Sequence, residues 1–286
     1  MSGAVTWSFL HPGGQSVAAV AGQIAEFIGS AEQEVAVAIY DFHVDAGGGG
    51  EVITHALQSA EERGVRVRLV DHDERKSDYK SCIPSPQKPP EYIDSLGLDV
   101  RPVVDPYGLM HHKYVVVDGR RLWMGSLNWT DDAFTLQENV FLTFEAPALA
   151  EAYRQNFDEL WELRVVEGTG EFDHAAVPVQ SSSERVRARP IFCPDRGPAL
   201  AADIAAAMRR ARRRILVCSP VLTSGPILGA LTDVLERDGL SISGVVDGTM
   251  MRGVLRQWDE LTPESWKPDA YRYIARRTGF SGRPST

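Results

Sequence analysis

Apolar residues in the first half of the chain alternate between short continuous runs and stretches with helical spacing. The runs at Val5 to Leu10, Glu34 to Asp41 and Val65 to Val70 have the length of buried strands, whereas Ser16 to Ala31 and Glu51 to Arg63 have helical periodicity. Strands that alternate with helices are typical of an α/β fold. The hydrophobic pattern therefore predicts an α/β protein.

The second half follows the same order of elements. The pattern predicts a strand and an Ala-rich helix at Phe192 to Arg213, a strand at Ile215 to Ser219, a helix at Pro226 to Arg237 and a strand at Leu240 to Val246. We interpret this order as an internal repeat, joined by a polar linker with a Ser181 to Ser183 run. The predicted parts are a first repeat at 1–165, the linker at 166–189 and a partial second repeat at 190–286.

Composition and charge narrow the class of protein. With 43% hydrophobic and 24% charged residues, the chain has the profile of a globular protein. Its net charge of -9 argues against a protein that coats nucleic acid, because such binding needs concentrated Lys and Arg. A local basic site remains compatible with this charge.

Cysteine content and the N-terminus bear on location. Three cysteines, Cys82, Cys193 and Cys218, have no metal-ligand spacing and leave an odd thiol in any disulfide scheme. The sequence has no leader-peptide pattern and no apolar run long enough for a transmembrane segment. We therefore expect a cytoplasmic protein.

The sequence predicts a β-hairpin between Met110 and Thr130 that carries several polar side chains. The Asp-Gly pair that starts at Asp118 is a strong signal for a two-residue turn, which would place His111 opposite Ser126. Strand alternation then gathers four polar side chains on one face: His111, Lys113, Ser126 and Asn128.

These residue types suit attack on a phosphodiester without a metal or a cofactor. A neutral imidazole at His111 is a competent nucleophile near pH 7, and Lys113 offers positive charge to nonbridging oxygens. Ser126 and Asn128 offer neutral hydrogen-bond donors for substrate binding. Asp118 lies at the turn, and strand alternation points it to the face opposite His111 and Lys113. We therefore expect it to support the site through hydrogen bonds or an ion pair.

The pattern His-x-Lys-x4-Asp-x6-Gly-Ser-x-Asn, from His111 to Asn128, resembles the signature of the phospholipase D superfamily. This superfamily includes phospholipases, phospholipid synthases and nucleases. The resemblance implies a mixed sheet flanked by helices, with a twofold internal repeat. It also implies that His111 forms a phosphohistidine intermediate, and that Glu138 is the acidic residue that helps to hold this histidine.

Members of this superfamily carry two such motifs in one chain, or one motif per chain in a twofold dimer. The second motif provides the acid that protonates the leaving alcohol. This sequence has no second His-x-Lys, and the interval from Asp71 to His111, applied after Asp247, runs one position past the last residue. Either a homodimer completes the site or the chain is a truncated form of a longer enzyme. We favour truncation, because a single-motif protein would not need most of a second repeat.

Several other residues near these strands invite a chemical interpretation. Asp41 and His43 follow a predicted strand end, where α/β proteins place ligand-contacting loops. His112 has the opposite parity to His111 and is expected to pack or to face solvent. Trp123 is expected in the core, whereas the pattern leaves the role of Trp129 open.

The segment Asp71 to Glu74 resembles a metal cluster in composition, and we interpret it as part of a solvated loop that extends to Pro90. No metal site is therefore predicted.

The leading functional hypothesis is a hydrolase or transferase that acts on phospholipid head groups. A metal-independent endonuclease of the same superfamily is the enzyme alternative, which the net negative charge of the chain disfavours. A noncatalytic phosphate-binding protein, or an inactive fragment, is the alternative from another class, and the missing second His-x-Lys is the feature that favours it.

Overall fold

The computed structural model describes residues 3–43, 47–72, 96–104 and 109–283. The described chain forms two compact units, and the boundary between them lies between Arg196 and Gly197. All of the predicted site residues lie in the first unit.

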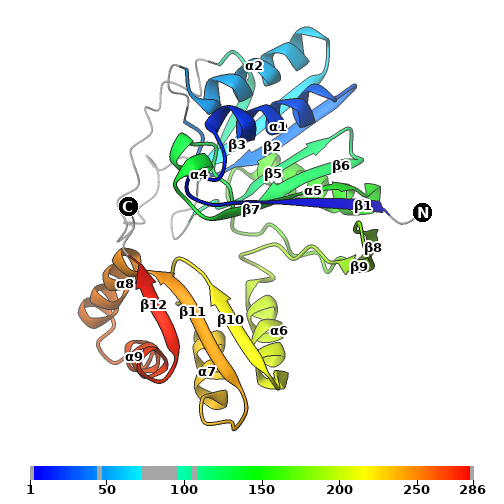
Figure 1. Cartoon of the computed structure of the whole chain (residues 1–286). Helices are drawn as coiled ribbons and strands as arrows, with labels where there is room; N and C mark the ends of the chain where they lie inside the picture. The colour runs from blue at the N-terminus through cyan, green and yellow to red at the C-terminus, as the bar shows by residue number, and fades with distance from the viewer. Residues whose placement is uncertain (1–2, 44–46, 73–95, 105–108, 284–286) are drawn as a thin grey trace. The chain divides into compact units, whose positions relative to one another are not determined.

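A mixed sheet forms the first unit, as expected (Figure 1). Among the described residues its nine strands lie in the order β4-β3-β2-β5-β6-β7-β1-β8-β9. Their bounds are β1 Gly3–Leu10, β2 Glu34–Ile39, β3 Arg66–His72, β4 Asp99–Val103, β5 Lys113–Val117, β6 Arg121–Gly125, β7 Asn139–Glu145, β8 Val177–Gln180 and β9 Arg185–Ala188. Strands β2, β3 and β4 are parallel, and β5 joins them by antiparallel pairing with β2.

Helices cover both faces of this sheet. The helices in the described part of the first unit are α1 Val17–Gly29, α2 Gly49–Glu62, α4 Asp131–Thr135 and α5 Pro147–Leu163. Helix α1 begins after Ser16, whose hydroxyl accepts a hydrogen bond from the Ala19 amide and so satisfies one of the free N–H groups at the helix start.

Alternate residues of β5 and β6 face two separate cores. Val115, Val117 and Trp123 pack with residues of α1 and α2, whereas Tyr114 and Leu122 pack with residues of α5. This alternation explains why β5 is buried throughout: a strand covered on both faces has no solvent-facing position.

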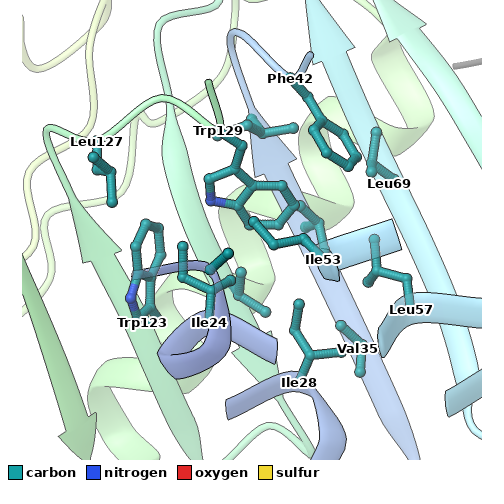
Figure 2. Packing of buried hydrophobic residues seen from close by; sticks show 14 of the residues in the cluster. Ile24, Ile28, Val35, Phe42, Ile53, Leu57, Leu69, Trp123, Leu127 and Trp129 are labelled. Carbon is teal, nitrogen blue, oxygen red and sulfur yellow. The ribbon is translucent and has the colours of Figure 1, made fainter. Parts of the chain in front are cut away.

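The two tryptophans of the hairpin region are both core residues. Trp123 is 1% exposed, which confirms its predicted place, and Trp129 is 0% exposed. Figure 2 shows Trp129 beside Phe42, and their rings meet edge to face with centroids 5.0 Å apart. Neither indole is therefore free to stack on a base or to line a lipid site.

The hairpin register differs by one residue from the expected register. Val117 pairs with Arg121, so the connection has three residues where we expected two. Asp118 and Gly119 both have positive φ, 52° and 59°, and Arg120 completes the loop. The expectation that alternation alone places His111 opposite Ser126 was therefore wrong. Ser126 and Asn128 follow the end of β6, where the chain leaves the sheet.

The segment 166–189, expected as a linker, contributes strands β8 and β9 to the sheet. β8 pairs in parallel with β1, and β9 pairs with β8. These strands are four residues each. The apolar pattern did not predict them, because β8 contains Pro178 and β9 alternates arginine with small apolar residues.

The second unit contains a parallel sheet of three strands among its described residues, in the order β10-β11-β12. The bounds are α6 Gly197–Arg210, β10 Arg214–Cys218, α7 Gly225–Val234, β11 Ser241–Asp247, α8 Gly248–Leu261, α9 Lys267–Arg277 and β12 Gly279–Arg283. Three successive parallel strands also occur in the first unit as β2, β3 and β4.

The strand expected near Phe192 to Arg196 does not form, because Pro194 has no N–H for a sheet and the chain turns directly into α6.

Within the described residues, no helix is long and apolar enough to cross a membrane.

Candidate active site

The site lies where β2 ends and β5 begins. The paired residues Ile39 and Lys113 are the last of the β2–β5 ladder, and the Tyr40 amide extends it by donating to the His112 carbonyl at 2.8 Å. His111 therefore stands at the end of two central strands, next to a residue whose main chain is held by a hydrogen bond.

His111 is accessible from solvent on one side and packed on the other. Its ring centroid is 4.7 Å from that of Tyr40. Loss of water around the packed side lowers the pKa of His111 to about 4, with further lowering by the positive charge of Lys113 and by His112 and His72, while Asp41 opposes the shift. The imidazole is thus neutral at pH 7, which is the state a nucleophile needs.

Lys113 brings a cation to the same place. The residue is 6% exposed, and its Nζ donates to the His111 carbonyl at 3.1 Å and lies 4.9 Å from the centre of the Tyr40 ring. A positive charge held in a largely water-free position interacts strongly with an anion that enters the site. Lys113 is therefore placed to bind phosphate oxygens.

Gly125 allows β6 and β7 to approach each other closely just before the motif's Ser. A Cβ at this position would lie 2.2 Å from the Val140 carbonyl oxygen. The hydroxyl of the next residue, Ser126, donates to Asn139 Oδ1 at 2.8 Å and accepts from the Val140 amide at 3.1 Å. Ser126 therefore ties the site segment to β7 in this structure.

Asn128 is held between buried neighbours. The Trp129 amide donates to the Asp41 carbonyl at 2.8 Å, and the His43 amide donates to the Trp129 carbonyl at 3.0 Å. The Asn128 Oδ1 atom is buried and has no hydrogen-bond partner among the described residues. An uncompensated buried amide oxygen costs free energy, so this atom is a candidate for contact with a bound ligand.

Asp118 has the structural role that was expected for it. Its carboxylate accepts hydrogen bonds from the amides of Glu32, Gln33 and Glu34, and it lies 4.0 Å from Arg121. Burial alone would raise its pKa, but these three amides and the Arg121 charge outweigh burial and lower the pKa below its ordinary value. Asp118 fixes the far end of the hairpin and is not a lining residue of the pocket described below.

Glu138 does not contact His111. It is exposed, and within the described chain no hydrogen bond or ion pair involves its carboxylate. The carboxylate whose charge acts on His111 is that of Asp41, which is 7% exposed. Tyr40 is a site residue that the sequence analysis missed, because its place beside His111 depends on the non-local pairing of β2 with β5.

His72, which the sequence analysis placed in a solvated loop, is buried at the end of β3. It is 2% exposed, and its Nδ1 accepts from the Met110 amide at 3.3 Å. The remaining residues of the metal-like segment, from position 73 onward, lie outside the described residues. In the part of the chain that is described, no group of three or more His, Cys, Asp or Glu side chains is arranged to hold a metal ion.

A pocket of about 670 Å³ opens beside His111. Its polar wall includes His111, His112 and Lys113, and its remaining wall is largely apolar, with Leu109, Met124, Val166, Ile191 and Phe192 among the lining residues. Ser126 and Asn128 are not lining residues of this pocket. Residues 166–167 were expected in the linker and residues 191–194 in the second repeat. Both segments line this pocket in the first unit.

His112 packs into this wall, as expected from its parity. Its ring lies 5.7 Å from that of Tyr114 and 6.3 Å from that of Phe192. Burial, followed by the charge of Lys113, lowers the pKa of His112 to about 4. His112 is therefore neutral at pH 7 and shapes the pocket.

The lowered pKa of His111 predicts unusual tolerance to acid. A histidine with the ordinary pKa of 6.5 would be mostly protonated at pH 5.5, whereas His111 stays neutral until the pH approaches about 4. We expect kcat/KM for a phosphodiester to fall through pH 4 as His111 is protonated. Because the unfolded chain protonates His111 and His112 near pH 6.5, acid also favours unfolding between these values, so circular dichroism must accompany each rate. A loss of activity centred at pH 6.5 in folded protein would contradict the structure.

Comparisons with known proteins agree with this geometry. A family model described as "Cardiolipin synthase, PLD-like domain" matches residues 24–161. A mitochondrial cardiolipin hydrolase of Xenopus laevis is 38% identical over 111 residues, which are 38% of this chain and 49% of that protein. A protein of the same name from Chlamydomonas reinhardtii is 27% identical over 138 residues, 48% of this chain and 56% of that protein.

The chain spans about half the length of the curated relatives it matches. Among solved structures, phosphatidylserine synthase of Haemophilus influenzae aligns with a TM-score of 0.56 at 12% identity, over 94% of this chain and 66% of that chain. At this identity the likeness concerns the fold alone. Over residues 24–161, just under half of the chain, the sequence is similar to the PLD-like domain of this family model, as it is to the cardiolipin hydrolases.

Proposed function

We propose that this protein is a phosphodiesterase in which His111 attacks phosphorus and Lys113 binds the nonbridging oxygens. The observation that carries the proposal is a neutral imidazole beside a buried ammonium group, at the mouth of a pocket. Attack forms a P–N bond to His111 and breaks the P–O bond to the first alcohol. Water then breaks the P–N bond, which releases the second product and restores His111.

Phospholipid is the substrate class that the pocket favours. Its apolar wall suits an acyl or other hydrocarbon group attached to the phosphodiester. Phe192 is 4% exposed and packs against Tyr153 with ring centroids 4.9 Å apart, so its ring offers little surface for stacking with a nucleobase. The relatives named cardiolipin hydrolases also support a lipid substrate.

Turnover measured in EDTA tests this function. We expect hydrolysis of bis(p-nitrophenyl) phosphate and of a diacyl phospholipid in mixed micelles, and slower cleavage of a single-stranded oligonucleotide. Cleavage of the oligonucleotide in preference to lipid, with a steep dependence on salt, would support the nuclease alternative. Phosphate binding without turnover of any diester would show a noncatalytic protein.

A homodimer would offer a second His111 as the proton donor for the leaving alcohol. Mixing wild-type chains with an excess of His111→Ala chains tests this arrangement. If two His111 side chains share one site, activity per wild-type chain falls as mixed dimers form. Unchanged activity, with a monomeric molar mass, would show that one chain is sufficient.

Changing the apolar wall should affect lipid binding more than chemistry. Ile191→Gln places an amide in the wall of the pocket, so it should raise KM for a long-chain phospholipid about 10-fold. The kcat for bis(p-nitrophenyl) phosphate should change less than about 2-fold, because Ile191 is not one of the residues proposed to act on phosphorus. An equal effect on both substrates would argue against a lipid-binding role for this wall.

A further inference from the structure

The pocket beside His111 holds two charges of opposite sign. Of its lining residues in the described chain, Lys113 bears the one positive charge and Glu167 the one negative charge. His111 and His112 are neutral at pH 7, because burial above all lowers the pKa of each to about 4. The other lining residues have uncharged side chains. The pocket therefore presents a cation and an anion to the molecule that enters it.

A closed turn fixes the main chain at Glu167. The preceding residue, Val166, is 4% exposed and packs in the core shared with α5. Its carbonyl accepts hydrogen bonds from the Thr169 amide at 3.1 Å and from the Thr169 hydroxyl at 2.7 Å. Gly168 has a φ of 78°, the left-handed conformation that a turn of this kind requires at its third residue. Glu167 is the second residue of the turn.

The chain that follows the turn packs against the pocket wall. Thr169 is 0% exposed, and the Gly170 amide donates to Glu159 Oε2 at 2.8 Å. A Cβ at Gly170 would lie 2.5 Å from the Phe192 Cβ, so the two segments are in direct contact. The turn is thus held on both sides, while the side chain of Glu167 stays exposed.

The carboxylate of Glu167 has no structural task in the described part of the chain. No hydrogen bond or ion pair to a described residue involves it. The nearby acidic residues differ in this respect: Glu159 accepts the Gly170 amide, and Glu162 lies 3.8 Å from Arg101. The charge of Glu167 is therefore available to a molecule in the pocket.

This charge pattern favours a zwitterionic ligand. A phosphodiester brings one negative charge, which Lys113 is placed to bind. Choline and ethanolamine head groups add an ammonium group a short linker away from the phosphate, and the Glu167 carboxylate attracts that group. A head group with a second phosphate, or a nucleic acid with phosphates on both sides, is repelled by the same carboxylate. The largely apolar wall strengthens both effects, because it holds little water to screen them.

We propose that Glu167 forms a head-group site for an ammonium group, so that the pocket selects zwitterionic phospholipids over anionic ones. The phosphate lies between His111 and Lys113, the head group extends toward Glu167, and the acyl chains lie along the apolar wall. This inference rests on the proposed function, because His111 and Lys113 set the position of the phosphate.

Binding of two short-chain lipids tests the head-group site without turnover. Dihexanoyl phosphatidylcholine and dihexanoyl phosphatidylglycerol, below their micelle concentrations, are titrated by calorimetry into His111→Asn protein, which keeps both pocket charges. We expect the Kd of the choline lipid to be about 5-fold lower, the size of effect that an exposed charge pair supports. Adding Glu167→Gln should bring the two Kd values within about 2-fold, and adding Glu167→Lys should reverse the preference.

Glu171→Lys is the matched control. Glu171 is exposed, lies four residues further along the chain and does not line the pocket, so this change should leave the preference as it was. Thermal unfolding verifies the fold of each variant.

The outcomes separate this inference from the proposed function. Equal affinities for the two lipids, no binding of either, or a preference that survives Glu167→Lys would overturn the head-group site. So would an equal response to Glu171→Lys, which would show a general effect of surface charge. If wild-type protein bound the lipids with the expected preference but hydrolysed neither of them, the proposed function would fail and the head-group site would stand.

Discussion

Replacing His111 with Asn should reduce kcat for bis(p-nitrophenyl) phosphate by at least about 10⁴-fold. Asn is smaller than His but keeps a polar side chain. Its amide nitrogen is not nucleophilic, so the P–N bond cannot form. KM should change little, because Lys113 and the pocket wall still bind the diester. Steady-state kinetics, with circular dichroism to verify the fold, provide the measurement.

A matched change at His112 serves as the control for this prediction. His112 is the neighbouring histidine and also lines the pocket, but it is packed against Tyr114 and Phe192. His112→Asn should therefore retain kcat within about 100-fold, well above the His111→Asn variant. Comparable losses in both variants would remove the distinction between nucleophile and pocket wall.

Replacing Asp118 with Ala should lower the free energy of unfolding by about 3 kcal/mol, because three backbone amides lose a charged acceptor. For a unit of this size, such a loss corresponds to a decrease in Tm of roughly 6–12 °C. Asp118→Asn is the matched control, since one amide oxygen can still accept from Gln33 and Glu34 and Asn tolerates the positive φ of 52°. Its loss of stability should be smaller.

The pH dependence of this stability difference has a definite sign. The pKa of Asp118 is lower in the folded protein than its ordinary value, so its contribution is complete above the ordinary value. It decreases as the pH falls through the folded pKa. The gap in Tm between wild type and Asp118→Ala should therefore narrow in acid. A constant gap, or full stability of the Ala variant at pH 7, would contradict the hydrogen bonds assigned to Asp118.

The residues that form the site could be predicted from the sequence because they lie close together along the chain. His111 and Lys113 are two residues apart at the start of one strand, and the structure places both in the wall of one pocket. The α/β class was likewise visible in the spacing of apolar residues, since β2 and β5 are covered on both faces. These features depend on short-range order, which sequence pattern reports well.

Features that depend on distant pairing were missed or misplaced. The Asp-Gly signal at Asp118 favoured a two-residue turn, but hydrogen bonds from residues 32–34 hold its carboxylate and the loop closes one residue later, at Arg121. Among the described strands, β9 pairs only with β8, and it has few apolar residues. Tyr40 reaches His111 only because β2 lies beside β5.

The most direct test of the central claim is to trap the covalent intermediate on His111. Protein is mixed with excess bis(p-nitrophenyl) phosphate, quenched within milliseconds in alkali, where phosphohistidine is stable, and digested for mass spectrometry. The structure predicts one phosphoryl ester adduct per site, on the peptide that contains His111, and none in His111→Asn. Turnover without an adduct, or an adduct on a different residue, would show that His111 is not the nucleophile.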